Sequence, residues 1–346
     1  MIYTKLGNTG IEVSRICLGT MTFGEQNTEQ EAHEQLNYAL SMGINFIDTA
    51  ELYSVPGRKE TQGSTERYIG TWLKKRKDRD KLILATKIVG PSPGLTYIRN
   101  PLNFSREQIR LALDGSLKRL HTDYIDIYQL HWPERNVNNF GKLGFKHDAN
   151  EKWEDNFLEI LQSLNELIEE GKIRHWGLSN ETPWGVMNFI RKAEQCGLPK
   201  PITIQNPYNL LNRSYEVGLA EISIRENIGL LAYSPLAFGL LTGKYHNGAD
   251  VLKSRIKLFP KLSRYSSEHV YQIAEKYTDI AYKYGLSPSQ MTLAFVNTRP
   301  FLWSTIIGAT TMDQLKENIG SIHVSIPDEA FREIESLHKI NSNPAP

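Results

Sequence analysis

Acidic, basic and imidazole side chains stand where several short apolar runs of the sequence end. Asp48 ends one run, Lys87 ends the next, and His131 directly follows a third. Carboxyl, ammonium and imidazole groups are side chains that give and take protons in enzymes. Amide, hydroxyl and phenol groups end later runs in the same way, at Ser179-Asn180, Gln205-Asn206 and Tyr233-Ser234. Any one of these could be an ordinary polar residue at the rim of a fold, but so many together predict one shared site.

The apolar runs are predicted to be the strands of a parallel sheet. They are short, rich in Ile, Leu and Val, and separated by segments with the apolar spacing of amphipathic helices. Most read as the continuous apolar runs that are typical of buried parallel strands. Eight are expected, at residues 16–20, 44–48, 82–87, 125–130, 173–179, 202–205, 229–233 and 304–308. Eight β/α units favour an α/β fold of the closed (β/α)8 TIM barrel type over an open doubly wound sheet.

Capping signals mark the starts of the helices between these strands. Thr28 with Glu31, and Ser105 with Gln108, have the spacing of a capping box ahead of an apolar stripe. These signals place a helix after the first strand and another after the third, as the barrel requires.

Other segments have predicted places of their own. Residues 3–6 and 11–13 flank a glycine-containing turn and predict an N-terminal β-hairpin, which could cap the bottom of the barrel. Three long loops, 89–103, 134–156 and 246–266, each follow a strand end and are therefore expected on the C-terminal face. Active sites of this fold lie on that face, and long loops there are usually lids or binding loops. No repeat or linker divides the chain, so residues 1–346 are predicted to form a single domain.

The composition is that of a globular protein without a charge bias. Lys plus Arg is 40 and Asp plus Glu is 39, which argues against a nucleic-acid or anionic-membrane surface. Cys17 and Cys196 are far apart, which fits a reducing compartment and no disulfide framework. Neither a signal peptide nor a membrane-spanning run is recognised, so a cytoplasmic location is expected. No spacing of His, Cys or acidic residues indicates a metal site.

Several stretches of the sequence match the motifs of one protein family in the same order. They are residues 17–20 (CLGT), 45–53 (NFIDTAELY), 85–87 (ATK), 126–133 (DIYQLHWP), 171–180 (GKIRHWGLSN), 232–236 (AYSPL) and 307–311 (IGATT). Along nearly its full length the chain thus resembles the aldo-keto reductases. Within that family it is most similar to the bacterial Tas-like branch, which is related to the potassium-channel β-subunits.

The resemblance implies a catalytic tetrad of Asp48, Tyr53, Lys87 and His131. A carbonyl that gains hydride at carbon needs a proton at oxygen, and Tyr53 is the expected donor, since a free phenol has a pKa of about 10. Lys87 would stabilise the phenolate, and Asp48 would hold Lys87 in place. His131 would hydrogen-bond the carbonyl oxygen and polarise it. The structural alternatives are a surface tyrosine, a salt bridge at the barrel rim and a core histidine.

The cofactor implied by the resemblance is NADPH, although the chain lacks the G-x-G-x-x-G of a Rossmann site. Thr311 and Gln314 have capping-box spacing, so a helix that begins there would direct free N–H groups and its positive end at the barrel mouth. By resemblance, the nicotinamide carboxamide would be bound by Ser179, Asn180 and Gln205. Tyr233 would stack on the ring, Lys244 would reach the pyrophosphate, and Gln314, Glu317 and Asn318 would surround the adenosine. Further cofactor contacts are expected from Ser234, Leu236, Gly308 and Thr310.

A cation is needed for the 2′-phosphate that distinguishes NADPH from NADH. Ser254 and Arg255 are similar to the family's phosphate-binding pair. Because this loop aligns loosely, Arg264 or Lys257 could serve instead.

Phe23 and Trp132 are expected, by the same resemblance, to form apolar walls around the reacting carbon of a small carbonyl substrate. Trp132 could equally be packing under its loop.

The leading prediction for the function is NADPH-dependent reduction of aldehydes and ketones to alcohols, by a monomer or an oligomer. The first alternative is an NADPH-binding sensor or partner-binding subunit with little turnover, because the channel β-subunits use this scaffold in assembly. The second is an isomerase or aldolase in which Lys87 forms a Schiff base.

Overall fold

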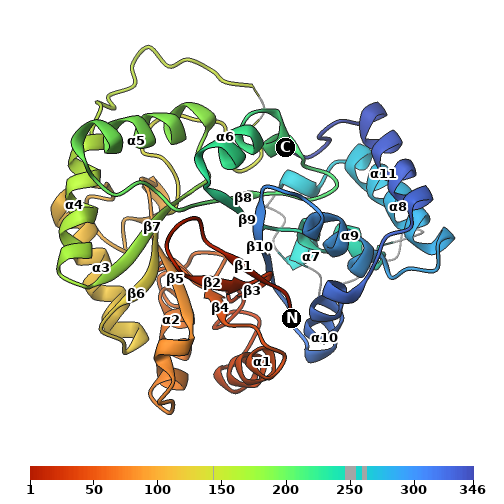
Figure 1. The fold of residues 1–346 in the computed structure, drawn as a ribbon, viewed down its shortest axis with the longest axis horizontal. Coiled ribbons are helices and arrows are strands. Elements are labelled where there is room, and N and C mark those ends of the chain that lie inside the picture. The colour runs from red at the N-terminus through yellow and green to blue at the C-terminus, as the bar shows by residue number, and fades with distance from the viewer. Residues whose placement is uncertain (143, 246–254, 259–262) are drawn as a thin grey trace.

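A closed barrel of eight parallel strands forms the centre of the protein (Figure 1). The computed structural model describes residues 1–142, 144–245, 255–258 and 263–346, but not the side chains of Arg255, Lys257 and Ser263. Within this part, the strands follow one another around the barrel in chain order, and β10 closes against β3. The predicted (β/α)8 TIM barrel is therefore confirmed.

The barrel strands lie where the apolar runs predicted them. They are β3 (Ile16–Gly19), β4 (Phe46–Asp48), β5 (Ile83–Ile88), β6 (Ile125–Leu130), β7 (Ile173–Ser179), β8 (Thr203–Pro207), β9 (Gly229–Tyr233) and β10 (Leu302–Ile307). Each strand overlaps its predicted segment, and its ends differ from the prediction by at most two residues.

Helices follow the strands and cover the outside of the barrel (Figure 1). They are α1 (Glu29–Ser41), α2 (Ser64–Leu73), α3 (Arg106–Leu120), α4 (Phe157–Glu169), α5 (Pro183–Cys196), α6 (Leu219–Glu226), α7 (Arg255–Leu258), α8 (Glu268–Lys283), α9 (Pro288–Asn297), α10 (Met312–Gly320) and α11 (Asp328–Ile340). The capping box predicted at the start of α1 is present. The one predicted for Ser105 and Gln108 is wrong, because the Ser105 hydroxyl donates to Asn103 Oδ1 (2.9 Å) and Gln108 Oε1 accepts from Arg99 (3.1 Å).

The inside of the barrel is packed in layers because alternate strand residues point inward. Phe46, Ala85 and Ile127 belong to one apolar cluster with Leu6 and Val13 of the N-terminal hairpin. This hairpin, β1 (Tyr3–Lys5) and β2 (Glu12–Ser14), therefore closes the bottom of the barrel, as the sequence suggested.

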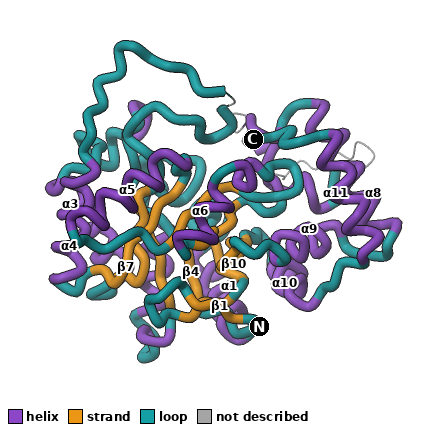
Figure 2. The backbone as a smooth tube through the Cα atoms, turned by 45° about the horizontal axis from the view of Figure 1, so that its top comes forward, coloured by secondary structure: helices purple, strands orange, loops and turns teal. Residues whose placement is uncertain are grey.

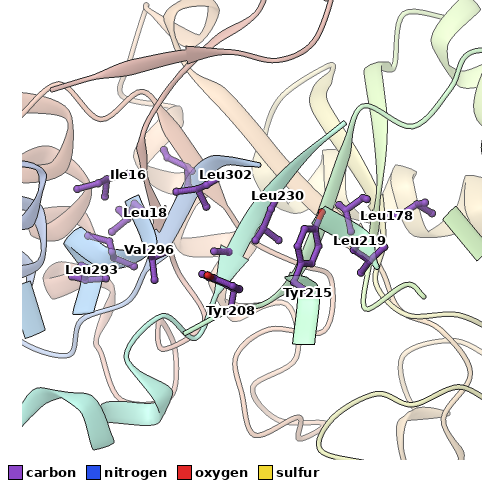
Figure 3. Close-up of a cluster of buried hydrophobic side chains, with 14 of the residues drawn as sticks. Ile16, Leu18, Leu178, Tyr208, Tyr215, Leu219, Leu230, Leu293, Val296 and Leu302 are labelled. Atoms are coloured by element: carbon purple, nitrogen blue, oxygen red, sulfur yellow. The ribbon is translucent and has the colours of Figure 1, made fainter. Parts of the chain in front are cut away.

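The outward-facing side chains of the strands pack under the helices and form the larger apolar cluster. Figure 3 shows a part of this layer, with side chains from β3, β9 and β10 beside those of α9 and of the segment before α6. The residues labelled there include Ile16, Leu18, Leu230, Leu293, Val296, Leu302 and Tyr215. The polar residues at the strand ends are thus held by a fully packed scaffold.

A buried carboxylate fastens the N-terminal end of β5 to its neighbours. Asp126 of β6 accepts a hydrogen bond from the backbone N–H of Leu84 (3.0 Å) and pairs with Arg79 (2.8 Å) and Arg174 (3.0 Å). Both guanidinium groups also lie over the ring of Tyr124, at 4.2 and 4.4 Å from its centroid. This arrangement is on the opposite end of the barrel from Asp48, Lys87 and His131, so we assign it a role in stability.

We expect the substitution Asp126→Ala to lower the free energy of unfolding and to leave cofactor binding unchanged. The loss should be about 3 kcal/mol, the lower end for a broken buried pair, because Arg79 and Arg174 can still reach water. Urea unfolding followed by circular dichroism measures it. An unchanged unfolding midpoint would contradict the structural role.

The loops on the C-terminal face differ in how they are fixed. The loop between β6 and α4 arches away from the barrel (Figures 1 and 2), and Arg135 ties its start to Glu181 and to the ring of Trp184 (4.9 Å). Most of the predicted loop 246–266 lies outside the described residues.

Of the helices that the structure describes, none is long and apolar enough to cross a membrane.

Candidate active site

Asp48, Lys87 and Tyr53 meet at the C-terminal end of the barrel. Asp48 and Lys87 lie two residues beyond Phe46 and Ala85 along β4 and β5, so their side chains also point inward, one layer above the apolar cluster. Lys87 Nζ donates to Asp48 Oδ2 (2.6 Å) and to the carbonyl oxygen of Thr49 (2.7 Å). It also lies 4.9 Å from the centroid of the Tyr53 ring.

The environment keeps Lys87 protonated although it is fully buried. Burial lowers the pKa of this amine, but the Asp48 carboxylate and the Tyr53 phenol beside it favour the charged form more strongly, and the net effect is a raised pKa. The site therefore contains a fixed positive charge next to a phenol. That is the arrangement required for a tyrosine to release its proton to a substrate oxygen.

His131 is buried on the other side of Tyr53, and the two rings make an edge contact with centroids 5.8 Å apart. Burial first, and then the positive charge of Lys87, lowers the pKa of His131 well below its usual value. Its Nδ1 has no hydrogen-bond partner within the part of the chain that the structure describes. A neutral imidazole with this orientation can hydrogen-bond a carbonyl oxygen but does not supply a charge.

The buried neutral state of His131 predicts how stability depends on pH. An unfolded histidine gains a proton near pH 6.5, whereas the folded one resists it, so the free energy of unfolding should fall as the pH drops below about 6.5. We expect a smaller fall in His131→Gln, measured by urea unfolding at several pH values. A remaining slope is expected from His121, His175 and His338, whose pKa values burial also lowers. Identical slopes in both proteins would rule out a neutral, buried His131.

Two amide side chains orient the carboxylate of Asp48. Gln129 Nε2 (3.2 Å) and Gln205 Nε2 (2.8 Å) both donate to Asp48 Oδ1, and Gln205 also donates to Gln129 Oε1 (3.0 Å). Both oxygens of Asp48 are thus engaged, one by amides and the other by Lys87. Sequence reasoning missed Gln129, although a glutamine two residues before His131, near the end of a predicted buried strand, was a usable signal.

The residues expected at the nicotinamide lie together around the end of β7. Ser179 Oγ donates to the carbonyl oxygen of Gln205 (2.9 Å), and Asn180 Nδ2 donates to that of His131 (2.9 Å). The phenol of Tyr233 donates to Asn180 Oδ1 (2.6 Å). This network connects the candidate cofactor residues of β7, β8 and β9 directly to His131.

The chain after β9 makes a tight turn that brings Gly239 close to the ammonium group of Lys244. Ser234 has a positive φ of 52°, and Leu236 precedes the short helix η4 (Ala237–Thr242). A Cβ atom at Gly239 would lie 2.5 Å from Lys244 Nζ, so only glycine allows the amine this position. Burial lowers the pKa of Lys244, and no carboxylate among the described residues pairs with it.

The chain after β10 forms the predicted helix start. Thr311 is the N-cap of α10, and its hydroxyl accepts from the backbone of Gln314 (3.3 Å). The Gln314 side chain reaches the backbone N–H of Thr310 (2.9 Å), not that of Thr311, so the capping box is displaced by one residue. Asn318 Nδ2 donates to the carbonyl oxygen of Gly308 (3.1 Å). Glu317 accepts from the hydroxyl of Ser287, the N-cap of α9 (2.5 Å).

Arg264 lies next to the cofactor residues of β9. Burial lowers its pKa, but hydrogen bonding and proximity to the phenols of Tyr233 and Tyr265 raise it more. Among the other predicted phosphate ligands, Ser254 lies outside the described residues, and so do the side chains of Arg255 and Lys257.

The two expected substrate walls, Trp132 and Phe23, lie in different apolar clusters. Trp132 and Tyr53 belong to one apolar cluster at the site, and the ring of Phe140 lies 5.6 Å from that of Trp132. Phe23 is fully buried and belongs to the cluster under the helices, and its role as a substrate wall stays a prediction. Met21 of the same loop is partly exposed and packs against the cluster of Tyr53 and Trp132.

Comparison with known proteins agrees with this geometry. Residues 15–339 match the model of the aldo/keto reductase family. The chain is 51% identical to Protein tas of Escherichia coli (strain K12), with all of both chains covered. It is 33% identical to the uncharacterized oxidoreductase YrpG of Bacillus subtilis (strain 168), over 97% of this chain and 96% of the relative. It is 31% identical to a probable voltage-gated potassium channel subunit beta of Arabidopsis thaliana, over 94% and 92%.

Proposed function

The chain belongs to the aldo/keto reductase family of oxidoreductases, as its motifs indicated, and we propose that it reduces aldehydes and ketones to alcohols with NADPH. The proposal rests on one observation above all. Lys87 is a fully buried cation that touches Asp48 on one side and the ring of Tyr53 on the other. We also propose that residues 1–346 act as one domain.

Tyr53 is the proposed donor of the proton that the carbonyl oxygen gains. The nearby ammonium of Lys87 stabilises the phenolate that remains, and Asp48 keeps this ammonium in place through a direct hydrogen bond (2.6 Å). His131 is the proposed orienting group, because a neutral imidazole can donate a hydrogen bond to the same oxygen without competing as an acid. A bound nicotinamide would supply the hydride.

The residues present fit a phosphorylated dinucleotide. The half-buried Lys244 has no carboxylate partner among the described residues, which is the expected state of a group that pairs with an incoming anion. Arg264 is the proposed cation for the 2′-phosphate, since its side chain is described next to Tyr233, although Arg255 and Lys257 stay alternatives. Gln205 donates through its Nε2, so its carbonyl oxygen is the proposed acceptor for the carboxamide N–H.

The Schiff-base alternative is disfavoured by the charge state of Lys87. A Schiff base forms from a neutral amine, whereas the raised pKa of Lys87 keeps it protonated at neutral pH. The sensor or subunit alternative retains support from the relative that is a probable potassium channel subunit beta. The proposed reductase and the sensor or subunit differ in whether the protein turns over a carbonyl substrate.

The deciding experiment is the absorbance change of NADPH with a panel of aromatic and aliphatic aldehydes and ketones, with NADH in parallel. We expect turnover with NADPH and weaker activity with NADH. Tight NADPH binding without turnover on any carbonyl would favour the sensor or subunit, and pull-down of a stable partner would then be the next measurement.

A further inference from the structure

The turn that carries Tyr53 is fastened to β5 by the residue two positions before it, Glu51. The backbone pairing of β4 and β5 continues past both strands: Thr49 N donates to Ala85 O (2.9 Å), and Glu51 N donates to Lys87 O (3.2 Å). In a parallel pair such bonds recur every two residues. The next bond would run from the N–H of Val89 to the carbonyl oxygen of Glu51.

At that position a side chain replaces the backbone. Val89 N donates to the carboxylate oxygen Oε1 of Glu51 (2.7 Å), while the backbone carbonyl of Glu51 accepts from Gln62 Nε2 (2.6 Å). The chain can therefore turn away from β5 after Glu51 and still satisfy the last N–H of the ladder. Tyr53 lies two residues further along the chain. Its backbone N–H donates to Ala50 O (3.1 Å), and this hydrogen bond closes the turn.

Arg99 compensates the buried charge of Glu51. The Glu51 side chain is 2% exposed, and Arg99 Nη2 lies 2.6 Å from its Oε1. Arg99 also donates to the side chain of Gln108 in α3 (3.1 Å), which anchors the pair to a helix. Burial raises the pKa of Glu51, and Arg99 is the first group that opposes this rise without cancelling it.

We propose that Glu51, charge-compensated by Arg99, is a positioning residue for the reaction: it holds the turn that presents the Tyr53 phenol to Lys87. The proposal rests on the proposed reductase function for its kinetic consequences only. Glu51 acts indirectly, by joining the Tyr53 turn to the segment that carries Lys87.

The test compares Glu51→Ala and Glu51→Gln with a matched control. Asp126→Ala is the control, because Asp126 is also a buried carboxylate that accepts a β5 backbone N–H and pairs with arginine, but at the opposite end of the strand. The readouts are kcat and KM for a carbonyl substrate, the Kd of NADPH by fluorescence, and hydrogen exchange of the segments 48–56 and 87–92.

We expect Glu51→Ala to lower kcat by about 100-fold, the scale of an ångström-sized misplacement of a reacting group, with the Kd of NADPH unchanged. Glu51→Gln keeps an oxygen for Val89 N and should restore part of this loss. Asp126→Ala should lose stability and keep kcat. An unchanged kcat in Glu51→Ala, or an equal loss of kcat in Asp126→Ala, would overturn the proposal.

Hydrogen exchange separates this result from a failure of the proposed function. If the wild type reduces no carbonyl, faster exchange confined to segments 48–56 and 87–92 in Glu51→Ala would still support the positioning of Tyr53. Unchanged exchange in both segments would overturn it whatever the activity.

Discussion

Replacing Tyr53 with phenylalanine should lower kcat by about 100- to 10,000-fold, the range typical of a lost general acid. The substitution removes only the hydroxyl, and the ring can stay packed against Trp132 and beside Lys87. NADPH binding should therefore be unchanged, since its proposed ligands lie around β7, β8 and β9, at the start of α10 and at Lys244 and Arg264. The measurement is steady-state NADPH oxidation with the best carbonyl of the panel, together with the Kd of NADPH by fluorescence.

Tyr128→Phe is the matched control for this experiment. Tyr128 is also a buried tyrosine near the barrel end, but it faces the helices, and its hydroxyl has no hydrogen-bond partner within the described part of the chain. Loss of that hydroxyl should leave kcat unchanged. If Tyr53→Phe keeps the wild-type rate, the proton comes from another group, and Tyr53 is a structural residue.

Asp48 and Lys87 could be placed from the sequence because they lie at strand ends, whereas Tyr53 lies on the turn after β4 and was assigned by resemblance. A strand alternates its side chains strictly, so Asp48 and Lys87 inherit the inward direction of Phe46 and Ala85 two residues earlier. The barrel then brings neighbouring strand ends together. Local pattern and closure of the sheet were sufficient for these two residues.

Residues on loops were harder to place, as Phe23 and Met21 show. A family motif gives the position of a loop residue in the chain, but the direction of its side chain depends on the turn. Here the turn buries Phe23 under the helices and leaves Met21 at the site. Nothing in the local composition distinguishes the two directions.

Side-chain partners of the backbone were only partly predictable: the capping box of Thr28 and Glu31 is present, but the one expected at Ser105 is not. Ser105 has the spacing of a capping residue, yet its hydroxyl bonds Asn103, and the expected partner Gln108 accepts from Arg99. Glu51 accepts from Val89 N, a contact that exists only because β4 and β5 are adjacent. The Glu51 contact joins residues far apart in sequence and follows from the fold, which has to be known first, whereas the Ser105 hydroxyl simply takes a different local partner.

Replacing Lys87 with methionine should remove activity and destabilise the fold at the same time. Methionine keeps the length of the side chain, but the buried Asp48 carboxylate loses the donor to its Oδ2, and only the amides on Oδ1 remain. An uncompensated buried charge of this kind typically costs about 3 to 5 kcal/mol of unfolding free energy. Without the ammonium, the phenolate of Tyr53 also loses its stabilising charge, so kcat should fall even where the variant is folded.

The contribution of Lys87 to the free energy of unfolding should fall at alkaline pH. The pKa of Lys87 is raised above its usual 10.5 in the folded protein, so its contribution is complete below pH 10.5 and is lost as the pH rises through the folded value. Urea unfolding of the wild type should show this alkaline loss, and the loss should be smaller in Lys87→Met, where buried tyrosines with raised pKa values, such as Tyr128 and Tyr233, still contribute.

The double variant Asp48→Leu with Lys87→Met separates the two consequences. Removing both charges eliminates the unpaired carboxylate, so the unfolding free energy should recover relative to Lys87→Met alone, and a double-mutant cycle gives the coupling between the two side chains. Activity should stay lost, because the charge beside Tyr53 is still missing. Recovery of kcat together with stability would show that the pair is only structural, whereas recovery of stability alone means that the buried cation is retained for the proton transfer, at the stability cost of a charge in the barrel.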